Sequence, residues 1–474
     1  MLVIIAFISN TLFNFVVGLL VAKFLGPAEF GRFALAIAIT LVVQTTIFDW
    51  IRLSATRFYS ERTRAEEPGL RATLDLAFAI LALLLTLVGG FIAFAHFNLA
   101  LSGGVIGLAL AASIANGLFD YHSALVRARF NDHLYVRLII IKNILALLLT
   151  GGGAFFFESA AMTLLGGILS LVGSLGASRA SLVEDAAPAS EASRARMAEL
   201  AKYALPIVAA NILYLMIPLI NRSLVTSFYG FAETGQFSLA YDIGLKAAQA
   251  IGSTADVLLF QLAVRAHENH GPEKAQEQVA RNMAIVFAIL LPASVGIWLT
   301  LPSIEMLIVP GEYRGPFRHY LGLMLPGLCC LSLIQFAINP IFQIAKRTGP
   351  VIGAAVIACV AAPLFMLVLP HSADASSLAI AQAGAFGVAL IALILFASSS
   401  NPVWPKLRDL LGIIAGTVAM FAAVWPLYDM KPGVLTLVLQ MAVGGAVYAA
   451  FTLALDLAGL RTMITDRLAA RRAA

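Results

Sequence analysis

Fourteen stretches of apolar residues constrain this chain more than any other feature of its sequence. A helix that crosses a bilayer needs about 20 apolar residues, and each stretch comes close to that length. They lie approximately at residues 2–23, 30–51, 72–95, 103–126, 137–157, 160–178, 203–226, 236–260, 282–304, 319–343, 349–370, 376–398, 406–428 and 433–456. Only 12% of the residues are charged, too few to cover a water-facing surface. We therefore predict an all-α integral membrane protein with about 14 transmembrane helices.

A twelve-residue segment occurs twice in the chain. LGPAEFGRFALA, at Leu25–Ala36, returns 204 residues later as YGFAETGQFSLA, at Tyr229–Ala240, with seven positions identical. Each copy lies between two apolar stretches, so the repeated unit is a helix–turn–helix hairpin. Gly26 and Pro27 predict its turn, because proline lacks a backbone donor and glycine tolerates unusual dihedral angles. We interpret this hairpin as a structural element rather than a ligand site.

The spacing of the two copies predicts the architecture. An even number of spans separates them, so both halves enter the membrane in the same direction, as a parallel repeat. We expect two six-helix bundles around a central cavity, followed by two extra helices. The predicted domains are a first bundle at 1–178, a cytoplasmic linker at 179–202, a second bundle at 203–398, and two helices with a basic tail at 399–474.

Basic residues predict the orientation. With the N-terminus inside, 23 of the 31 Lys and Arg residues fall in cytoplasmic connections or the tail, and only five fall outside. This bias follows the positive-inside rule and places both termini in the cytoplasm. It also explains the sequence pI near 9.1 without nucleic-acid binding, which we do not expect.

Polar residues line up on one face of the first two helices of each half. An ionised side chain in mid-bilayer costs about 2.5–3.5 kcal/mol and normally faces a cavity. The aligned sets, at helical spacing, are Asn10, Asn14 and Gly18; Thr45, Asp49 and Arg52; Asn211, Tyr214, Pro218 and Arg222; and Asp242, Lys246, Gln249, Ser253 and Asp256. The four stripes predict a central hydrophilic cavity.

The sequence contains no phosphate-binding loop, metal-ligand cluster or nucleophile–base arrangement. We therefore expect no catalytic residue, cofactor or metal, and we expect a proton or sodium gradient to supply the energy. Asp242, Asp256 and Asp49 are the candidate ion carriers.

Several of these charged residues also fit a purely structural role. Asp242 and Lys246 can pair across one helical turn, and Arg222 can extend to the membrane interface. Two further pairs can form near the inner surface, namely Asp49 with Arg52 and Asp120 with Lys142.

The hairpin motif resembles a known family. Asn10, Asn14 and Gly18 before LGPAEFGRFALA, with Arg52 and SATRFYSER (54–62) after it, resemble the N-terminal signature of bacterial polysaccharide and O-antigen flippases. YGFAETGQFSLAYDIGLK, at 229–246, is similar to that family's second-half motif. The family belongs to the multidrug/oligosaccharidyl-lipid/polysaccharide exporter superfamily, and the resemblance implies two six-helix bundles facing a central cavity.

The resemblance further implies a function. Such a protein moves undecaprenyl-pyrophosphate-linked oligosaccharides of O-antigen (lipopolysaccharide), capsule or exopolysaccharide across the bacterial inner membrane, by ion-coupled antiport. Its partners would be the lipid-linked oligosaccharide, membrane lipids, a polysaccharide polymerase and a chain-length regulator. By the same resemblance, Arg222 and Lys246 would hold the pyrophosphate, and the sugar hydroxyls would meet Asn10, Asn14, Tyr214 and Gln249.

The sequence departs from the family pattern in two ways. Gly18 and Val42, which mirror Arg222 and Lys246, supply no deep cation, so we expect the anion grip on 203–226 and 236–260. The usual short basic leader is missing, and we expect the true start upstream of Met1.

Two other functions remain open. An ion-coupled multidrug exporter of the same superfamily is the main alternative. A membrane glycan polymerase or ligase is a remote one, because such enzymes carry a large outer loop and the largest here spans about 305–318.

Overall fold

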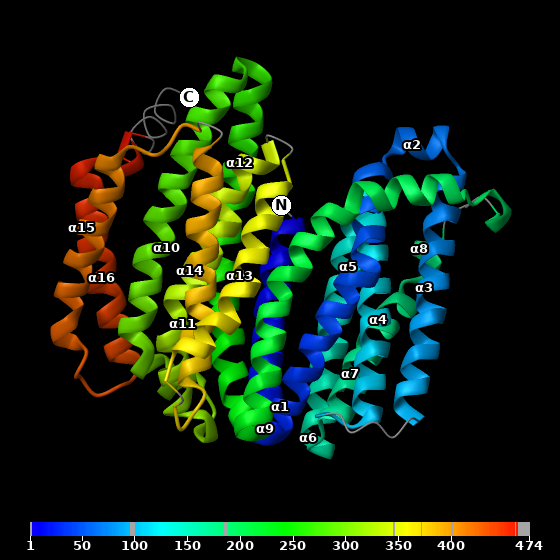
Figure 1. The fold of residues 1–474 in the computed structure, drawn as a ribbon, viewed down its shortest axis with the longest axis horizontal. Coiled ribbons are helices and arrows are strands. Elements are labelled where there is room, and N and C mark those ends of the chain that lie inside the picture. The colour runs from blue at the N-terminus through cyan, green and yellow to red at the C-terminus, as the bar shows by residue number, and fades with distance from the viewer. Residues whose placement is uncertain are drawn as a thin grey trace. The chain divides into compact units, whose positions relative to one another are not determined.

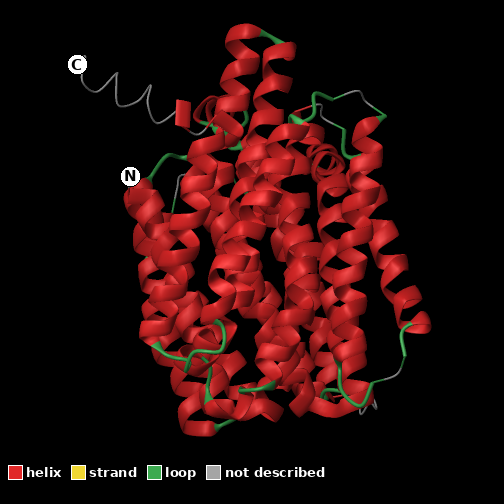
Figure 2. Ribbon diagram, turned by 90° about the vertical axis from the view of Figure 1, so that its left-hand side faces the viewer, coloured by secondary structure: helices red, strands yellow, loops and turns green. Residues whose placement is uncertain are grey.

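The structure is a computed structural model of the 474-residue chain, and its described elements are helices joined by turns (Figure 2). The main chain is described for residues 2–94, 100–183, 188–344, 347–370, 372–399, 402–459 and 461–462. Side chains are described over the same ranges except residues 2–8, 65, 189, 253–258, 260–261, 263–267, 270, 272, 343–344 and 458. No strand occurs within these ranges, which confirms the predicted all-α fold.

The chain divides into two compact units, residues 1–239 and 240–474. This boundary lies inside a helix and not in the predicted linker, so the predicted domain limits stay a prediction. Figure 1 labels the helices. Unit 1 contains α1 (Leu2–Phe58), α2 (Glu61–Glu66), α3 (Gly69–Phe94), α4 (Gly103–Ala128), α5 (Asp132–Leu145), the π-helix η1 (Ala146–Thr150), α6 (Gly151–Phe157), α7 (Ala160–Ala177), α8 (Arg179–Leu182), the 3₁₀ turn η2 (Ala189–Glu191) and the first part of α9 (Arg194–His270).

Helix α4 lies at the centre of unit 1, where it packs against α1, α3 and α7. Aromatic rings from three helices meet in this core. The ring centroids of Phe48 and Phe78 are 4.7 Å apart, and those of Phe78 and Tyr121 are 6.0 Å apart. Polar caps delimit the apolar helices, as where Asn131 Oδ1 accepts a hydrogen bond from Leu134 N at 3.1 Å and begins α5.

Unit 2 begins with the rest of α9. It continues with α10 (Pro272–Ile308), η3 (Gly311–Tyr313), α11 (Pro316–Leu333), the π-helix η4 (Ile334–Ile338), α12 (Asn339–Ile344), α13 (Gly349–Val368), α14 (Ser376–Ser398), α15 (Leu407–Val424), η5 (Trp425–Leu427), α16 (Val434–Leu455) and η6 (Leu457–Gly459). Helix α10 packs on α11 and on the pair α15 and α16. Tyr448 fixes this pair by donating to the carbonyl of Ala288 at 2.6 Å. The two extra C-terminal helices therefore attach to their unit through α10.

Twelve helical stretches in the described part are long and apolar enough to cross a membrane. Two of them, Ser9–Phe58 and Arg194–Gly252, have 50 and 59 residues, enough for two crossings each at about 20 residues per crossing. These two contain the paired spans predicted at each copy of the repeat. The fourteen predicted spans are thus all accounted for.

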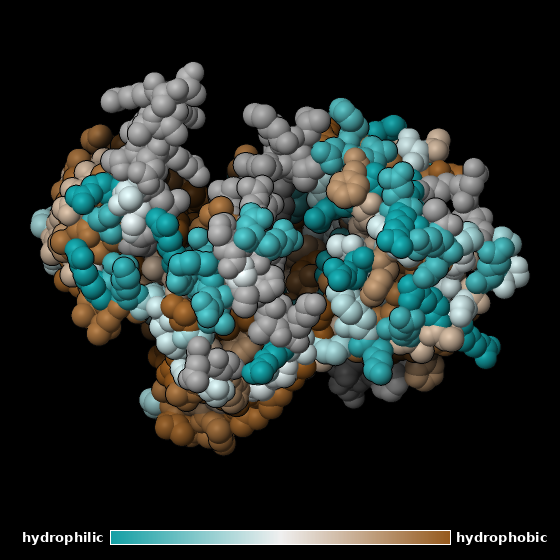
Figure 3. Space-filling view, turned by 90° about the horizontal axis from the view of Figure 1, so that it is seen from above, coloured by the Kyte–Doolittle hydropathy of each residue, from teal (hydrophilic) through white to brown (hydrophobic). Residues whose placement is uncertain are grey.

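One end of unit 1 gathers its basic connections. The hydrogen bond from Ser54 Oγ to Leu200 O at 3.3 Å joins segments 52–71 and 179–202, and the hydrogen bond from Arg137 Nη2 to Ala177 O at 3.0 Å joins segment 127–137 to the end of α7, just before residue 179. We call this the basic end. Figure 3 looks onto it, and hydrophilic residues gather over its surface.

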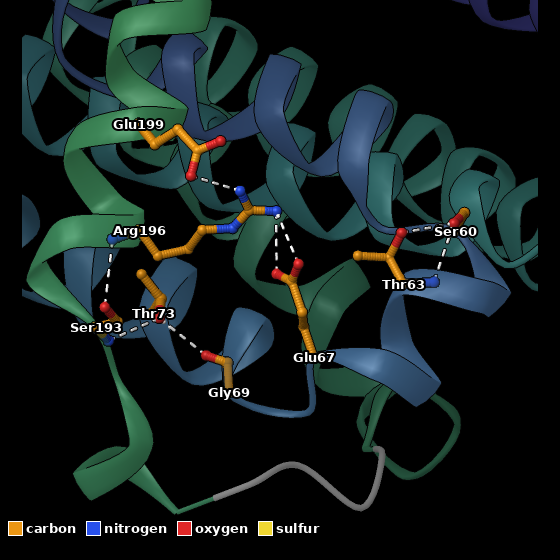
Figure 4. Close-up of polar contacts among 8 residues, drawn as sticks. All are labelled: Ser60, Thr63, Glu67, Gly69, Thr73, Ser193, Arg196 and Glu199. Carbon is orange, nitrogen blue, oxygen red and sulfur yellow. Dashed lines mark hydrogen bonds and ion pairs between the residues drawn. The ribbon is translucent and has the colours of Figure 1, made fainter.

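The predicted linker is partly helical, since it contains α8, η2 and the start of α9. Polar contacts tie the start of α9 to the start of α3 (Figure 4). Arg196 pairs with Glu67 at 3.0 Å, and Ser193 N donates to Thr73 Oγ1 at 3.0 Å. The segment just before α9 is therefore docked on the first bundle.

Candidate functional site

The two copies of the repeated hairpin bend at equivalent glycines. Gly26 interrupts α1 with φ 67° and ψ 172°, and Gly230 interrupts α9 with φ 85° and ψ 178°. Positive φ is accessible to glycine because it has no Cβ. The predicted turn is confirmed at Gly26, and its copy has the same backbone conformation.

The two hairpins also pack directly against each other within unit 1. A Cβ added at Gly31 would overlap the main-chain oxygen of Phe231, and one added at Gly235 would overlap the oxygen of Pro27. In the repeat, whose offset is 204 residues, Phe231 is equivalent to Pro27 and Gly235 is equivalent to Gly31. The same contact is thus made twice, as around a local two-fold axis, and only glycine allows so close an approach. We call this contact the glycine crossing.

Charged residues surround the glycine crossing. Arg222, only 4% exposed, donates from Nη1 to the carbonyl of Ala34 at 3.0 Å. Arg32 lies over the ring of Phe231 at 5.0 Å and pairs with Glu29. Glu29 also accepts a hydrogen bond from Ala160 N at 3.0 Å, at the start of α7. Arg222 therefore links α9 to α1.

A polar network lies among α1, α4 and α5. Lys142 Nζ donates to Asn10 Oδ1 at 2.7 Å, and Gln44 Nε2 donates to Asp120 Oδ2 at 2.7 Å. Since an uncompensated charge in a membrane is costly, such groups mark functional positions by default. We call Asn10, Gln44, Asp49, Arg52, Asp120 and Lys142 the unit 1 polar network.

Two of the predicted structural pairings have different outcomes in this network. Asp49 is 7% exposed and is held by Arg52 through two hydrogen bonds, Nε to Oδ1 at 3.0 Å and Nη2 to Oδ2 at 3.1 Å. Asp120 and Lys142 instead bond to Gln44 and Asn10. The first pairing is confirmed, whereas the second is replaced by contacts to neutral amides.

The other predicted site residues are distributed over both units. Asn14 and Tyr214 are half-buried in unit 1. In unit 2, Asp242 and Lys246 are half-buried and Gln249 is exposed. The side chain of Asp256 lies outside the described residues. Binding and ion carrying by all of these residues stay predictions.

Known proteins resemble this chain in sequence pattern and in fold. A family model described as "Polysaccharide biosynthesis protein" matches residues 20–309, more than half of the chain. The chain belongs to this polysaccharide biosynthesis family. In sequence, no curated protein matches it significantly.

Solved membrane transporters share the fold of this polysaccharide biosynthesis protein. "Lipid II flippase MurJ, inward closed conformation" is 16% identical with a TM-score of 0.71, covering 97% of this chain and 99% of that one. An inward-facing multidrug resistance MATE transporter of the MOP superfamily is 16% identical with a TM-score of 0.64, covering 82% and 94%. The all-helical flippase-like and exporter-like fold is thereby established.

Sequence reasoning missed two features of the polysaccharide biosynthesis protein. Gly18 and Val42, which mirror Arg222 and Lys246, carry no charge, so the sequence predicted no substrate-binding cation in the first half. Lys142 supplies a half-buried cation from α5, where it donates to Asn10 Oδ1. The identity of Gly31 and Gly235 was a visible signal for the glycine crossing, but their partners are apparent only in three dimensions.

Proposed function

We propose that this protein is a flippase for lipid-linked oligosaccharides in the bacterial inner membrane. Its substrate would be an undecaprenyl-pyrophosphate-linked unit of O-antigen, capsule or exopolysaccharide, moved by ion-coupled alternating access. The unit 1 polar network is the observation that carries the proposal, because it places two carboxylates and the cation Lys142 within apolar spans, with Arg52 at the edge of one. The family match and the flippase-like fold support it.

Substrate contacts follow from the predicted residues. Lys246 would hold the pyrophosphate, and Asn14, Tyr214 and Gln249 would meet sugar hydroxyls. Asn10 would do so while its amide oxygen is held by Lys142. Arg222, which donates from Nη1 to Ala34 O, would also contribute to the grip.

Ion coupling would use Asp242, Asp256 and the unit 1 polar network. Asp49 accepts two hydrogen bonds from the cation Arg52, whereas Asp120 accepts one from the neutral amide of Gln44. We therefore add Asp120 to Asp49 as a proposed carrier in unit 1. Both termini would be cytoplasmic, and a polymerase and chain-length regulator would act on the product.

The experiment is a flipping assay with purified protein in vesicles. A quencher added outside the vesicles reaches only the fluorescent undecaprenyl-pyrophosphate oligosaccharide in the outer leaflet. Wild-type protein is expected to move the inner-leaflet pool outward, so that this pool is quenched as well. Lys246→Ala should slow flipping by about 10- to 150-fold, because a charge-assisted hydrogen bond contributes about 1.5–3 kcal/mol. Lys246→Arg should retain most of the rate.

The matched control is Lys274→Ala, since Lys274 is an exposed lysine of the same unit paired with Glu277. It should flip at the wild-type rate. A pH or sodium gradient should change the wild-type rate, and Asp120→Asn should weaken that response. If the protein did not move the labelled substrate out of the inner leaflet but did transport cationic drugs, the multidrug exporter would replace the proposed flippase.

A further inference from the structure

A groove of about 460 Å³ opens at the basic end of unit 1. Helix α4 forms its floor with Leu118 and His122, α3 contributes Arg71 and Asp75, and α7 and α8 form the other wall. The glycine crossing and the unit 1 polar network contribute none of its lining residues. The groove is therefore a separate feature.

The charges in the groove are fixed by hydrogen bonds. Arg71 Nε donates to both oxygens of Asp75, at 2.9 and 2.8 Å, and Tyr121 Oη donates to Asp75 Oδ1 at 2.6 Å. The charges of Arg71 and Asp75 cancel, so the additional charge of Arg179 makes the lining net positive. Arg137 does not line the groove, but it donates to the carbonyl of Ala177, the neighbour of the lining residue Gly176, and so adds a positive charge nearby.

An apolar stripe leads into the groove along α7. Leu165, Leu169 and Val172 are 38%, 48% and 48% exposed, at steps of four and three residues on one helix face. Val172 also lines the groove. Because α7 is a candidate membrane span, we expect this exposed stripe to face acyl chains. A ligand that suits both parts carries a negative charge at one end and a hydrocarbon chain at the other.

We propose that this groove binds the phosphate headgroup of an anionic phospholipid from the leaflet at the basic end. Arg179 and Arg71 face the phosphate, and one acyl chain follows Leu165, Leu169 and Val172. The exposed carboxylate of Asp75 is kept from repelling the phosphate by its two hydrogen bonds from Arg71. Basic pockets between membrane helices on the cytoplasmic side are suited to such lipids. The stripe selects a lipid over a free phosphate ion.

The test is a lipid titration of the full chain by native mass spectrometry. Phosphatidylglycerol is compared with phosphatidylcholine of the same acyl chains, and wild-type protein is expected to bind the anionic lipid more tightly. Arg179→Ala should weaken phosphatidylglycerol binding roughly fivefold, as expected for loss of one cation near an anionic lipid. The control Arg62→Ala removes an exposed basic residue of the same unit, paired with Glu66, and should change nothing.

A second variant fills the groove without removing a charge. An added Cβ at Gly176 meets no atom within 4 Å, so Gly176→Leu should fold normally and occlude the site. Its thermal unfolding should match wild type while phosphatidylglycerol binding is lost. Equal binding of the two lipids, retained binding in Gly176→Leu, or displacement of phosphatidylglycerol by inorganic phosphate would overturn the proposal. None of these outcomes depends on the flipping assay.

Discussion

At the scale of single residues, the buried charges of unit 1 are stabilised by specific acceptors and donors. Arg222 bonds to the carbonyl of Ala34, Lys142 to the amide of Asn10, and Arg52 to both oxygens of Asp49. Each contact offsets part of the cost of placing an ion in an apolar span, about 2.5–3.5 kcal/mol on insertion scales.

Loss of Arg52 should therefore destabilise the protein. Arg52→Ala leaves Asp49, whose side chain is 10% exposed, without its bidentate partner. Removing one member of a buried pair costs about 3–5 kcal/mol, and Arg52 is partly exposed, so we expect about 3 kcal/mol. Unfolding by denaturant in detergent micelles measures this difference.

Arg62→Ala is the comparison for that measurement. Arg62 and Glu66 form an ion pair with 85% and 58% exposed side chains. Exposed pairs contribute at most about 1 kcal/mol. If both variants lost equal stability, the Asp49–Arg52 pair would have no special role.

At the scale of elements, the repeated hairpin has two different uses for its glycines. Gly26 and Gly230 provide backbone conformations with positive φ. Gly31 and Gly235 remove the side chains that would separate α1 from α9. The repeat thus preserves both a bend and a contact between the two bent helices.

Alanine at Gly31 or Gly235 should disrupt the glycine crossing. Because the added methyl group would overlap a main-chain oxygen, the backbone itself must move, and we expect a loss of at least about 1–3 kcal/mol. The two-fold relation predicts similar losses for Gly31→Ala and Gly235→Ala. Thermal unfolding in detergent measures both.

Gly90→Ala and Gly104→Ala provide matched controls in helices α3 and α4. An added Cβ at either position meets no atom within 4 Å. Alanine is the better helix former, so these variants should be as stable as wild type or up to about 1 kcal/mol more stable. Strongly unequal losses at Gly31 and Gly235 would contradict the local two-fold relation.

At the scale of the whole molecule, the distribution of basic residues predicts the orientation in the membrane. Segments 52–71, 127–137 and 179–202 lie at the same end of unit 1 and carry twelve Lys and Arg residues. The positive-inside rule predicts that this end faces the cytoplasm. The groove lined by Arg71 and Arg179 and the start of α9 lie at this same end.

Cysteine labelling can test this orientation. Cys329, Cys330 and Cys359 are first replaced by alanine. In intact cells, an impermeant thiol reagent should label Glu312→Cys but not Ser60→Cys, because both residues are exposed and the predicted orientation places them in outer and inner connections respectively. Permeabilised cells should show labelling at both positions. The reverse pattern would invert the topology.

The sequence by itself determined the all-helical membrane fold, the fourteen spans, the hairpin repeat and the family, because hydropathy and local repetition are properties of the linear chain. The pairing of Asp49 with Arg52 was also predictable, since both lie on one helix three residues apart. Only the tertiary structure decided that Lys142 meets Asn10, that Arg222 meets Ala34, and that Gly31 and Gly235 meet across two hairpins. These partners are 132 and 188 residues apart for the first two contacts. Contacts at such separations depend on how helices pack, which periodicity along one helix does not specify.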